Sequence, residues 1–118
     1  MAADQRTDQI FNNLAWGLDV CRRVNSPRFK IVYDIYHVQI SDGDVTRNLR
    51  DNFDMICHIH VAGVPGRNEI DETQEINYPA VMKAIVDTGF KGHVAQEFIP
   101  ARPDVLASLK QGVDICDV

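Results

Sequence analysis

The sequence lacks the features that mark membrane, disulfide-bonded and nucleic-acid-binding proteins. No apolar run approaches the ~18 residues of a membrane-spanning helix, and the polar segment 1–8 carries no secretion signal. We therefore expect a cytoplasmic protein with no membrane partner. The three cysteines contain no CxxC pair, which gives no support to zinc-finger or thioredoxin-like chemistry. Lysines and arginines form no cluster and the formal net charge is -5, so we expect no nucleic-acid partner.

The chain has the composition of one ordinary globular domain, with 118 residues of which 45% are hydrophobic and 25% charged. Segments with helical apolar spacing alternate with short runs rich in β-branched and aromatic residues. We expect helices over residues 8–24 and 44–52, from 77 to 89 and from 103 onward, and strands over 29–36, 55–62 and 92–98. Such alternation predicts right-handed crossovers and an α/β fold with parallel strands.

Ionisable side chains occur where the predicted strands end. Asp34 and His37 end the first strand, His60 ends the second and Glu97 ends the third. Because functional groups of parallel α/β folds lie at the carboxyl ends of the strands, we expect these side chains to meet at one rim. An Asp, a His and a Glu form a ligand set for Mn²⁺, Mg²⁺, Co²⁺ or Zn²⁺. Taken one at a time, each of these residues could instead be a helix cap or a hydrogen-bonded side chain of the core, with no functional role.

The alternation of side chains along a strand separates two of the histidines. His58 and His60 are two residues apart, so they share one face of their strand. If His60 is a ligand at the rim, His58 lies one layer deeper, where it hydrogen-bonds or fills space. His93, at the start of its strand, is interpreted as a surface or packing residue.

A long polar loop, residues 63–75, follows the second predicted strand. Its Pro65-Gly66 turn is expected to direct Arg67 back towards the strand end, where a guanidinium can grip a carboxylate or phosphate. A solvated loop arginine is the alternative. The acidic residues further along the loop are expected to form a solvated face: Glu69, Asp71, Glu72 and Glu75.

Four blocks of sequence contain these strand-end and loop residues. They are YDIYH at 33–37, HIHVA at 58–62 with VPGR at 64–67, EINYPAV at 75–81 and EFIP at 97–100. In this order and spacing they resemble the hydroxypyruvate isomerases and related ketose 3-epimerases of the xylose-isomerase-like superfamily. The match runs from about Arg6 to the end of the chain. One departure is Gly63, where the family loop usually has Asp.

The resemblance implies a (β/α)₈ TIM barrel with one divalent metal at its rim. The family's ligands are a Glu, an Asp, a His or Gln, and a second Glu on four successive strands. Asp34, His60 and Glu97 match the last three of these, and His37 and Arg67 match substrate-contacting residues. Glu97 also matches one of two glutamates that move a proton between adjacent carbons through a cis-enediolate. The implied substrate is a small hydroxy-carbonyl compound or keto acid.

Length is where the chain departs most from the family, because a complete barrel needs ~250 residues. We interpret residues 1–118 as a C-terminal part of the domain, with the last three βα units and a preceding helix. The strand carrying the first Glu is expected before Met1, so we expect no catalysis by this chain alone. Unpaired sheet edges favour pairing with another chain, and we expect a homodimer or higher homo-oligomer.

Three functions remain open at this point. The first is the metal-dependent isomerase or epimerase that the resemblance implies. The second is a phosphodiesterase of the endonuclease-IV type, which shares the barrel but needs a polynuclear metal site and a basic groove. The third is a non-catalytic partial barrel that serves as an oligomerising module.

Overall fold

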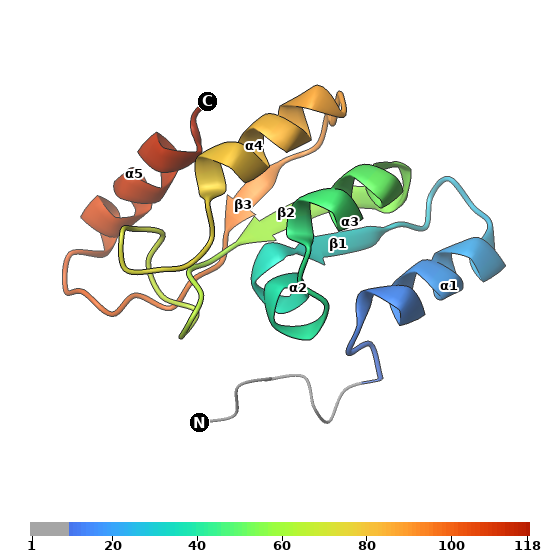
Figure 1. The fold of residues 1–118 in the computed structure, drawn as a ribbon, viewed down its shortest axis with the longest axis horizontal. Coiled ribbons are helices and arrows are strands. Elements are labelled where there is room, and N and C mark those ends of the chain that lie inside the picture. Colours follow the sequence, from blue (N-terminus) through green and yellow to red (C-terminus); the bar gives the residue numbers. More distant parts are fainter. Residues whose placement is uncertain (1–9) are drawn as a thin grey trace.

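Three parallel strands and the helices that connect them make up the part of the chain described by the computed structural model, residues 10–118 (Figure 1). The elements follow in the order α1 (Leu14–Val24), β1 (Ile31–Asp34), α2 (Ile35–Ser41), α3 (Val45–Asn52), the 3₁₀ turn η1 (Phe53–Met55), β2 (Ile56–Val61), α4 (Tyr78–Asp87), β3 (Val94–Gln96) and α5 (Val105–Cys116). No helix among these residues is long and apolar enough to cross a membrane.

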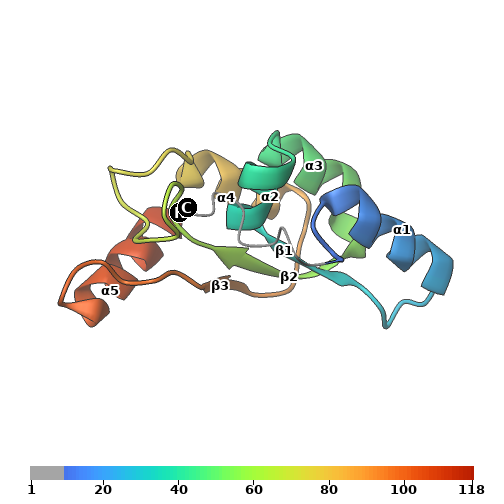
Figure 2. The same ribbon diagram turned by 90° about the horizontal axis from the view of Figure 1, so that it is seen from below.

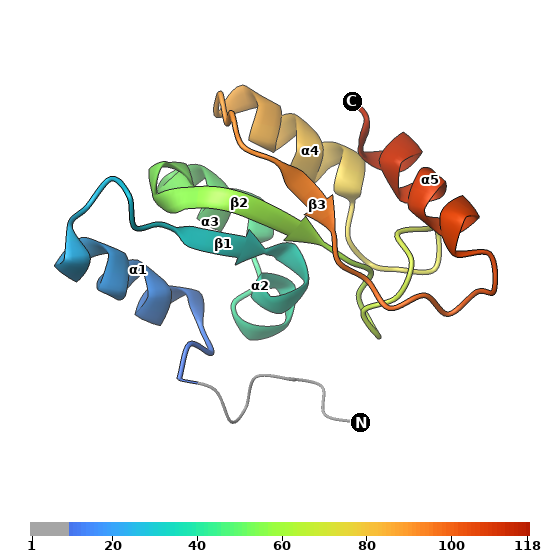
Figure 3. The same cartoon turned by 180° about the vertical axis from the view of Figure 1, so that it is seen from behind.

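The strands form one sheet in the order β1-β2-β3, with both pairs parallel. The predicted α/β class with parallel strands is therefore confirmed. Helices α3 and α4 cover one face of the sheet, and the opposite face carries no helix of the described chain (Figures 2 and 3). An open sheet with helices on one face is the arrangement of a segment of a TIM barrel.

The core lies between the sheet and the covering helices. Ile59 in β2, Tyr33 in β1 and Tyr78 at the start of α4 are almost completely buried. The two phenols keep their polar ends paired, since Tyr33 Oη donates to the Val45 carbonyl (2.8 Å) and Tyr78 Oη donates to the Ala62 carbonyl (2.6 Å). Burial raises the pKa of both phenols, so both stay neutral donors.

The first predicted strand is shorter than expected, because the chain turns into helix α2 directly after Asp34. The Asp34 carboxylate accepts the backbone N–H of His37 (3.2 Å) and caps this helix. His37 therefore lies in the first turn of α2 and not at a strand end. Residues 35–40 are rich in β-branched and aromatic side chains, a composition typical of a strand, so no helix was predicted there.

The other boundaries differ from expectation by a few residues at the ends. Helix α1 begins at Leu14 with Asn13 as its cap, so the prediction was wrong for residues 10–13, and residues 8 and 9 lie outside the described part. Strand β3 is only three residues long and begins after His93. The sheet ladder nevertheless continues past β3, since the N–H of Glu97 donates to the Val61 carbonyl (2.9 Å).

Helix α5 turns its apolar side to solvent. Leu106 is 78% exposed and Val113 57% exposed, whereas the buried residues of the helix are Ser108 and Gly112. The helix lies beside α4, beyond the β3 end of the sheet (Figures 1 and 3). Large apolar side chains of α5 are therefore left exposed in the described part of the chain.

Candidate metal centre

The parallel register brings the predicted ligands to one rim. Asp34, the last residue of β1, pairs with His60 in β2, and His60 pairs with Ala95 in β3. Glu97 is two residues beyond Ala95, so the pleat turns both to the same face of the sheet. That face is the one without helices, and in a TIM barrel it is the interior.

The three side chains lie close to one another at this rim. His60 Nδ1 is 2.9 Å from Glu97 Oε2 and 3.8 Å from Asp34 Oδ2. Asp34 and His60 are largely shielded, with side chains 15% and 25% exposed, whereas Glu97 is 52% exposed. One ligand atom from each residue lies within 4.8 Å of the others, and no second such group occurs in residues 10–118.

This donor set fits a divalent metal ion. Bonds of about 2.0–2.2 Å to nitrogen and oxygen allow two ligands to be at most about 4.4 Å apart. The ligand atoms of the three residues lie up to 4.8 Å apart, so they need to move only slightly closer to one another to bind one ion. One imidazole and two carboxylates suit Mn²⁺, Mg²⁺, Co²⁺ or Zn²⁺, as the sequence predicted, and do not distinguish among them.

Arg67 reaches the same place from the loop after β2. Its Nη2 lies 3.1 Å from Glu97 Oε2 and 3.7 Å from Asp34 Oδ2, and the guanidinium carbon lies 5.2 Å from the centre of the Tyr36 ring. The backbone takes a left-handed conformation at Arg67, with φ of 62°. Its positive charge compensates the two carboxylates, which would otherwise repel each other.

Two other histidines of the sequence each contact one member of this group. His37 Nε2 is 4.0 Å from Asp34 Oδ2, and its side chain is 14% exposed. The ring of His58 contacts the ring of His60 edge to face, with centroids 4.8 Å apart, one layer below the rim. His58 is thus placed beneath the predicted ligand, as its spacing indicated.

Two of the four acidic loop residues, Glu69 and Asp71, do not belong to the solvated face that was predicted for them. The side chain of Asp71 is only 9% exposed and lies 3.5 Å from the Arg102 guanidinium. The prediction was most wrong for Glu69. Instead of belonging to a solvated acidic face, it is 3% exposed, and its carboxylate accepts the backbone N–H groups of Ala101 and Arg102. The hydroxyl of Ser108 also donates to it (2.9 Å). These hydrogen bonds, of which the one from Ala101 has the largest effect, lower the pKa of Glu69 to about 2. Desolvation by burial acts in the opposite direction but is outweighed. Local sequence offers no sign of this, because the partners are 32 or more residues away.

A comparison with known families decides the assignment of the fold. The sequence model of the xylose isomerase-like TIM barrel family matches residues 3–115. This chain belongs to that family. The resemblance predicted from four sequence blocks is confirmed, and so is the interpretation of the three-stranded sheet as part of a TIM barrel.

Several known proteins are more than 30% identical to this chain over the aligned residues. A 2-oxo-tetronate isomerase of Cupriavidus necator is 37% identical over 84 residues, which are 71% of this chain and 32% of that protein. The hydroxypyruvate isomerase of Escherichia coli is 39% identical over 71 residues, or 60% of this chain and 27% of that protein. A crystal structure described as an AP endonuclease of family 2 from Brucella melitensis matches with a TM-score of 0.75 and 31% identity, over 86% of this chain and 37% of that chain. The chain spans between 27% and 37% of the length of these proteins.

Proposed function

We propose that this chain supplies part of the active site of a metal-dependent isomerase or epimerase that acts on a small hydroxy-carbonyl compound, with hydroxy-keto acids as the first candidates. The observation that carries the proposal is the meeting of Asp34, His60 and Glu97 with Arg67 at one rim of a parallel sheet. Relatives named as hydroxypyruvate isomerase and 2-oxo-tetronate isomerase support the substrate class. We expect the protein to act on dissolved metabolites in the cytoplasm.

Each residue at the rim has a chemical role in this proposal. A divalent ion bound by Asp34, His60 and Glu97 would supply Lewis-acid polarisation of the substrate carbonyl. Glu97, the most exposed of the three, can also take a proton from a carbon next to that carbonyl and return it to the neighbouring carbon. Arg67 is suited to hold a substrate carboxylate by charge-assisted hydrogen bonds, and His37 to bind a substrate hydroxyl.

A second carboxylate is needed if one group removes the proton and another returns it. The group of ligands among the described residues contains three members, and the family resemblance implies a further glutamate. We propose that residues 1–118 alone do not catalyse the reaction, and that the intact protein provides this glutamate.

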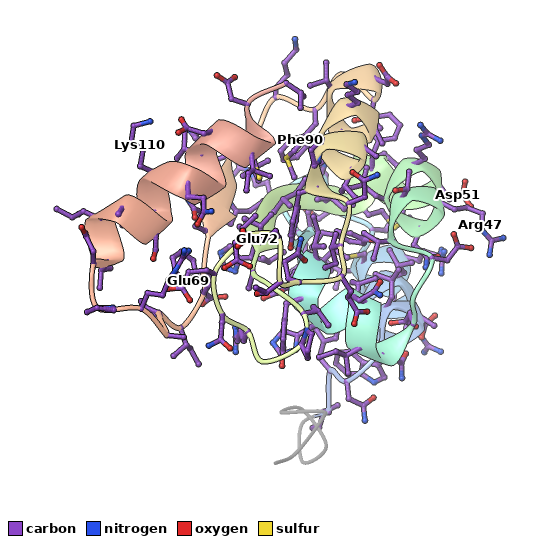
Figure 4. All side chains as sticks on the ribbon, turned by 60° about the vertical axis from the view of Figure 1, so that its left-hand side comes forward. Arg47, Asp51, Glu69, Glu72, Phe90 and Lys110 are labelled. Atoms are coloured by element: carbon purple, nitrogen blue, oxygen red, sulfur yellow. The ribbon has the colours of Figure 1, made fainter. Side chains whose placement is uncertain are left out.

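Proton exchange with solvent tests the proposed chemistry. The intact protein with Mn²⁺ and hydroxypyruvate in D₂O should place deuterium on the carbon adjacent to the carbonyl, as NMR can measure. Glu97→Gln should slow this exchange by ~100-fold or more, because general acid–base groups contribute about 10²–10⁴-fold. Glu72→Gln, on the exposed loop of Figure 4, is the matched control and should exchange at the wild-type rate. Equal rates in both variants, or no exchange with any hydroxy-keto acid or ketose, would contradict the proposal.

Arg67→Ala tests whether the arginine serves substrate binding. Losing a charge-assisted contact of ~1.5–3 kcal/mol should raise KM for an anionic substrate by about 10- to 100-fold and leave KM for a neutral ketose nearly unchanged. The stability change should stay below about 1 kcal/mol, since Glu97 is half exposed.

The control for this variant is Arg47→Ala on α3, an exposed residue (Figure 4) whose guanidinium pairs with Asp44 and contacts none of the predicted ligands. Arg47→Ala should leave KM unchanged for both the anionic substrate and the neutral ketose. A large loss of stability in Arg67→Ala with unchanged kinetics would instead identify Arg67 as a structural residue.

The phosphodiesterase alternative has weaker support. One relative of known structure is described as an AP endonuclease, which keeps this hypothesis open. A polynuclear site needs more ligands than the single group of three within residues 10–118, and the net charge of -5 does not favour an anionic polymer.

An oligomerising role is favoured by one specific observation. The sheet face without helices and the apolar side of α5 lie open, with Leu106 and Val113 exposed. We propose that a second copy of the chain covers these surfaces when residues 1–118 are isolated. Sedimentation should then give about twice the 13.3 kDa chain mass, whereas a monomer at millimolar concentration would refute this pairing.

A further inference from the structure

Two segments far apart in the sequence are joined beside the metal centre. The N–H of Ile99 donates to the Arg67 carbonyl (2.7 Å), and the side-chain amide of Asn68 donates to the Ile99 carbonyl (2.9 Å). Glu69 then binds the N–H groups of Ala101 (3.0 and 3.1 Å) and Arg102 (3.1 Å). Three successive residues of the loop after β2 thus hold the segment that directly follows Glu97.

Glu69 is the buried and charged member of this set. Besides the two backbone N–H groups and Ser108, it faces the Arg102 guanidinium, with Nε at 3.7 Å from Oε2. The same guanidinium lies 3.5 Å from Asp71. The hydrogen bonds hold the pKa of Glu69 at about 2, so the carboxylate is ionised throughout the neutral range. Figure 4 labels Glu69 on the loop, on the side towards α5.

The close approach of the loop to the strand end depends on Gly63. A Cβ at this position would lie 2.4 Å from the Glu69 carbonyl oxygen and 3.0 Å from that of Asn68. Instead, the N–H of Gly63 donates to the Asn68 carbonyl (2.9 Å). Gly63 thus allows the backbone of residues 68 and 69 to lie against the end of β2.

The direction in which the chain leaves β3 determines where the Glu97 side chain lies. Strand β3 is short and pairs only with β2. Within the sheet, the N–H of Glu97 is held by its hydrogen bond to the Val61 carbonyl. Residues 98–102 are outside any helix or strand, and their position is fixed mainly by the loop residues that bind them. A change at Glu69 should therefore be transmitted to Glu97, which is not in contact with it.

We infer that Glu69 is a positioning residue, whose buried carboxylate fixes segment 98–102 and thereby holds Glu97 beside Asp34, His60 and Arg67. The inference rests on the proposed function, since it assigns a role in the same site. Glutamine has the size of Glu69 but keeps only one of the two acceptor oxygens, places an NH₂ group near the backbone N–H groups and carries no charge to face Arg102. Glu69→Gln should therefore release the segment without removing volume from the core.

The experiment compares three variants of the intact protein at a temperature where circular dichroism shows all of them folded. Glu69→Gln removes the buried carboxylate that binds Ala101 and Arg102, and Glu72→Gln removes an exposed carboxylate of the same loop. Ser108→Ala removes the contact to α5 but leaves the bonds to Ala101 and Arg102. Amide hydrogen exchange at Ile99, Mn²⁺ affinity by calorimetry, and kcat/KM are measured for each.

In Glu69→Gln we expect the Ile99 amide to exchange at least ~10-fold faster, because opening of the segment is no longer opposed by the buried carboxylate. Mn²⁺ affinity and kcat/KM should fall about 10- to 100-fold, the usual loss when a group that orients a ligand is removed. Glu72→Gln and Ser108→Ala should stay within about twofold of wild type in all three measurements.

Three results would overturn the inference. The first is unchanged Ile99 exchange in Glu69→Gln. The second is faster exchange with wild-type Mn²⁺ affinity and kcat/KM. The third is an equal effect of Ser108→Ala, which would make Glu69 only an anchor for α5. If the wild type neither binds Mn²⁺ nor isomerises any hydroxy-carbonyl compound, the proposed function has failed. The rate of Ile99 amide exchange in Glu69→Gln then decides by itself whether Glu69 holds segment 98–102.

Discussion

The in-register pairing of Asp34, His60 and Ala95 across three parallel strands is the constraint on which the site depends. A shift of one residue in either strand pair would turn a ligand to the helix side of the sheet. The core enforces this register, because Tyr33 and Ile59 alternate with the rim residues and are almost completely buried on the other face. Hydrophobic burial on one side thus fixes the positions of ionisable groups on the other.

Two carboxylates held at one rim repel each other, and the surrounding residues lower that cost. His60 and Arg67 both lie against Glu97, and Arg67 also approaches Asp34. The arginine comes from a loop with no regular structure, so its position depends on the loop's bonds to segment 98–102. The loop and the rim are thus joined through segment 98–102, and in our proposal the buried charge at Glu69 supports the charged groups at the rim.

Periodicity and strand-end chemistry were sufficient to predict the parallel sheet and the residues that meet at its rim. Those predictions rest on local pattern and on the geometry shared by all parallel α/β folds. Helix α2 was missed because the β-branched and aromatic residues after Asp34 suit a strand, whereas the Asp34 side chain caps a helix there. Glu69 was missed because its environment is created by residues more than 30 positions away. The open side of α5 could not be anticipated, since an apolar stripe predicts burial whether or not a partner is present.

Electron spin echo spectroscopy of Mn²⁺ bound to the intact protein tests the central claim most directly. If Asp34, His60 and Glu97 hold the metal, the spectrum should contain modulation from one directly coordinated imidazole nitrogen. His60→Gln, which substitutes an oxygen ligand, should abolish this modulation while Mn²⁺ still binds. His58→Gln, one layer below and on the same face, should retain it. Modulation that is absent in the wild type, or that survives in His60→Gln, would contradict the assignment of this rim as a metal centre.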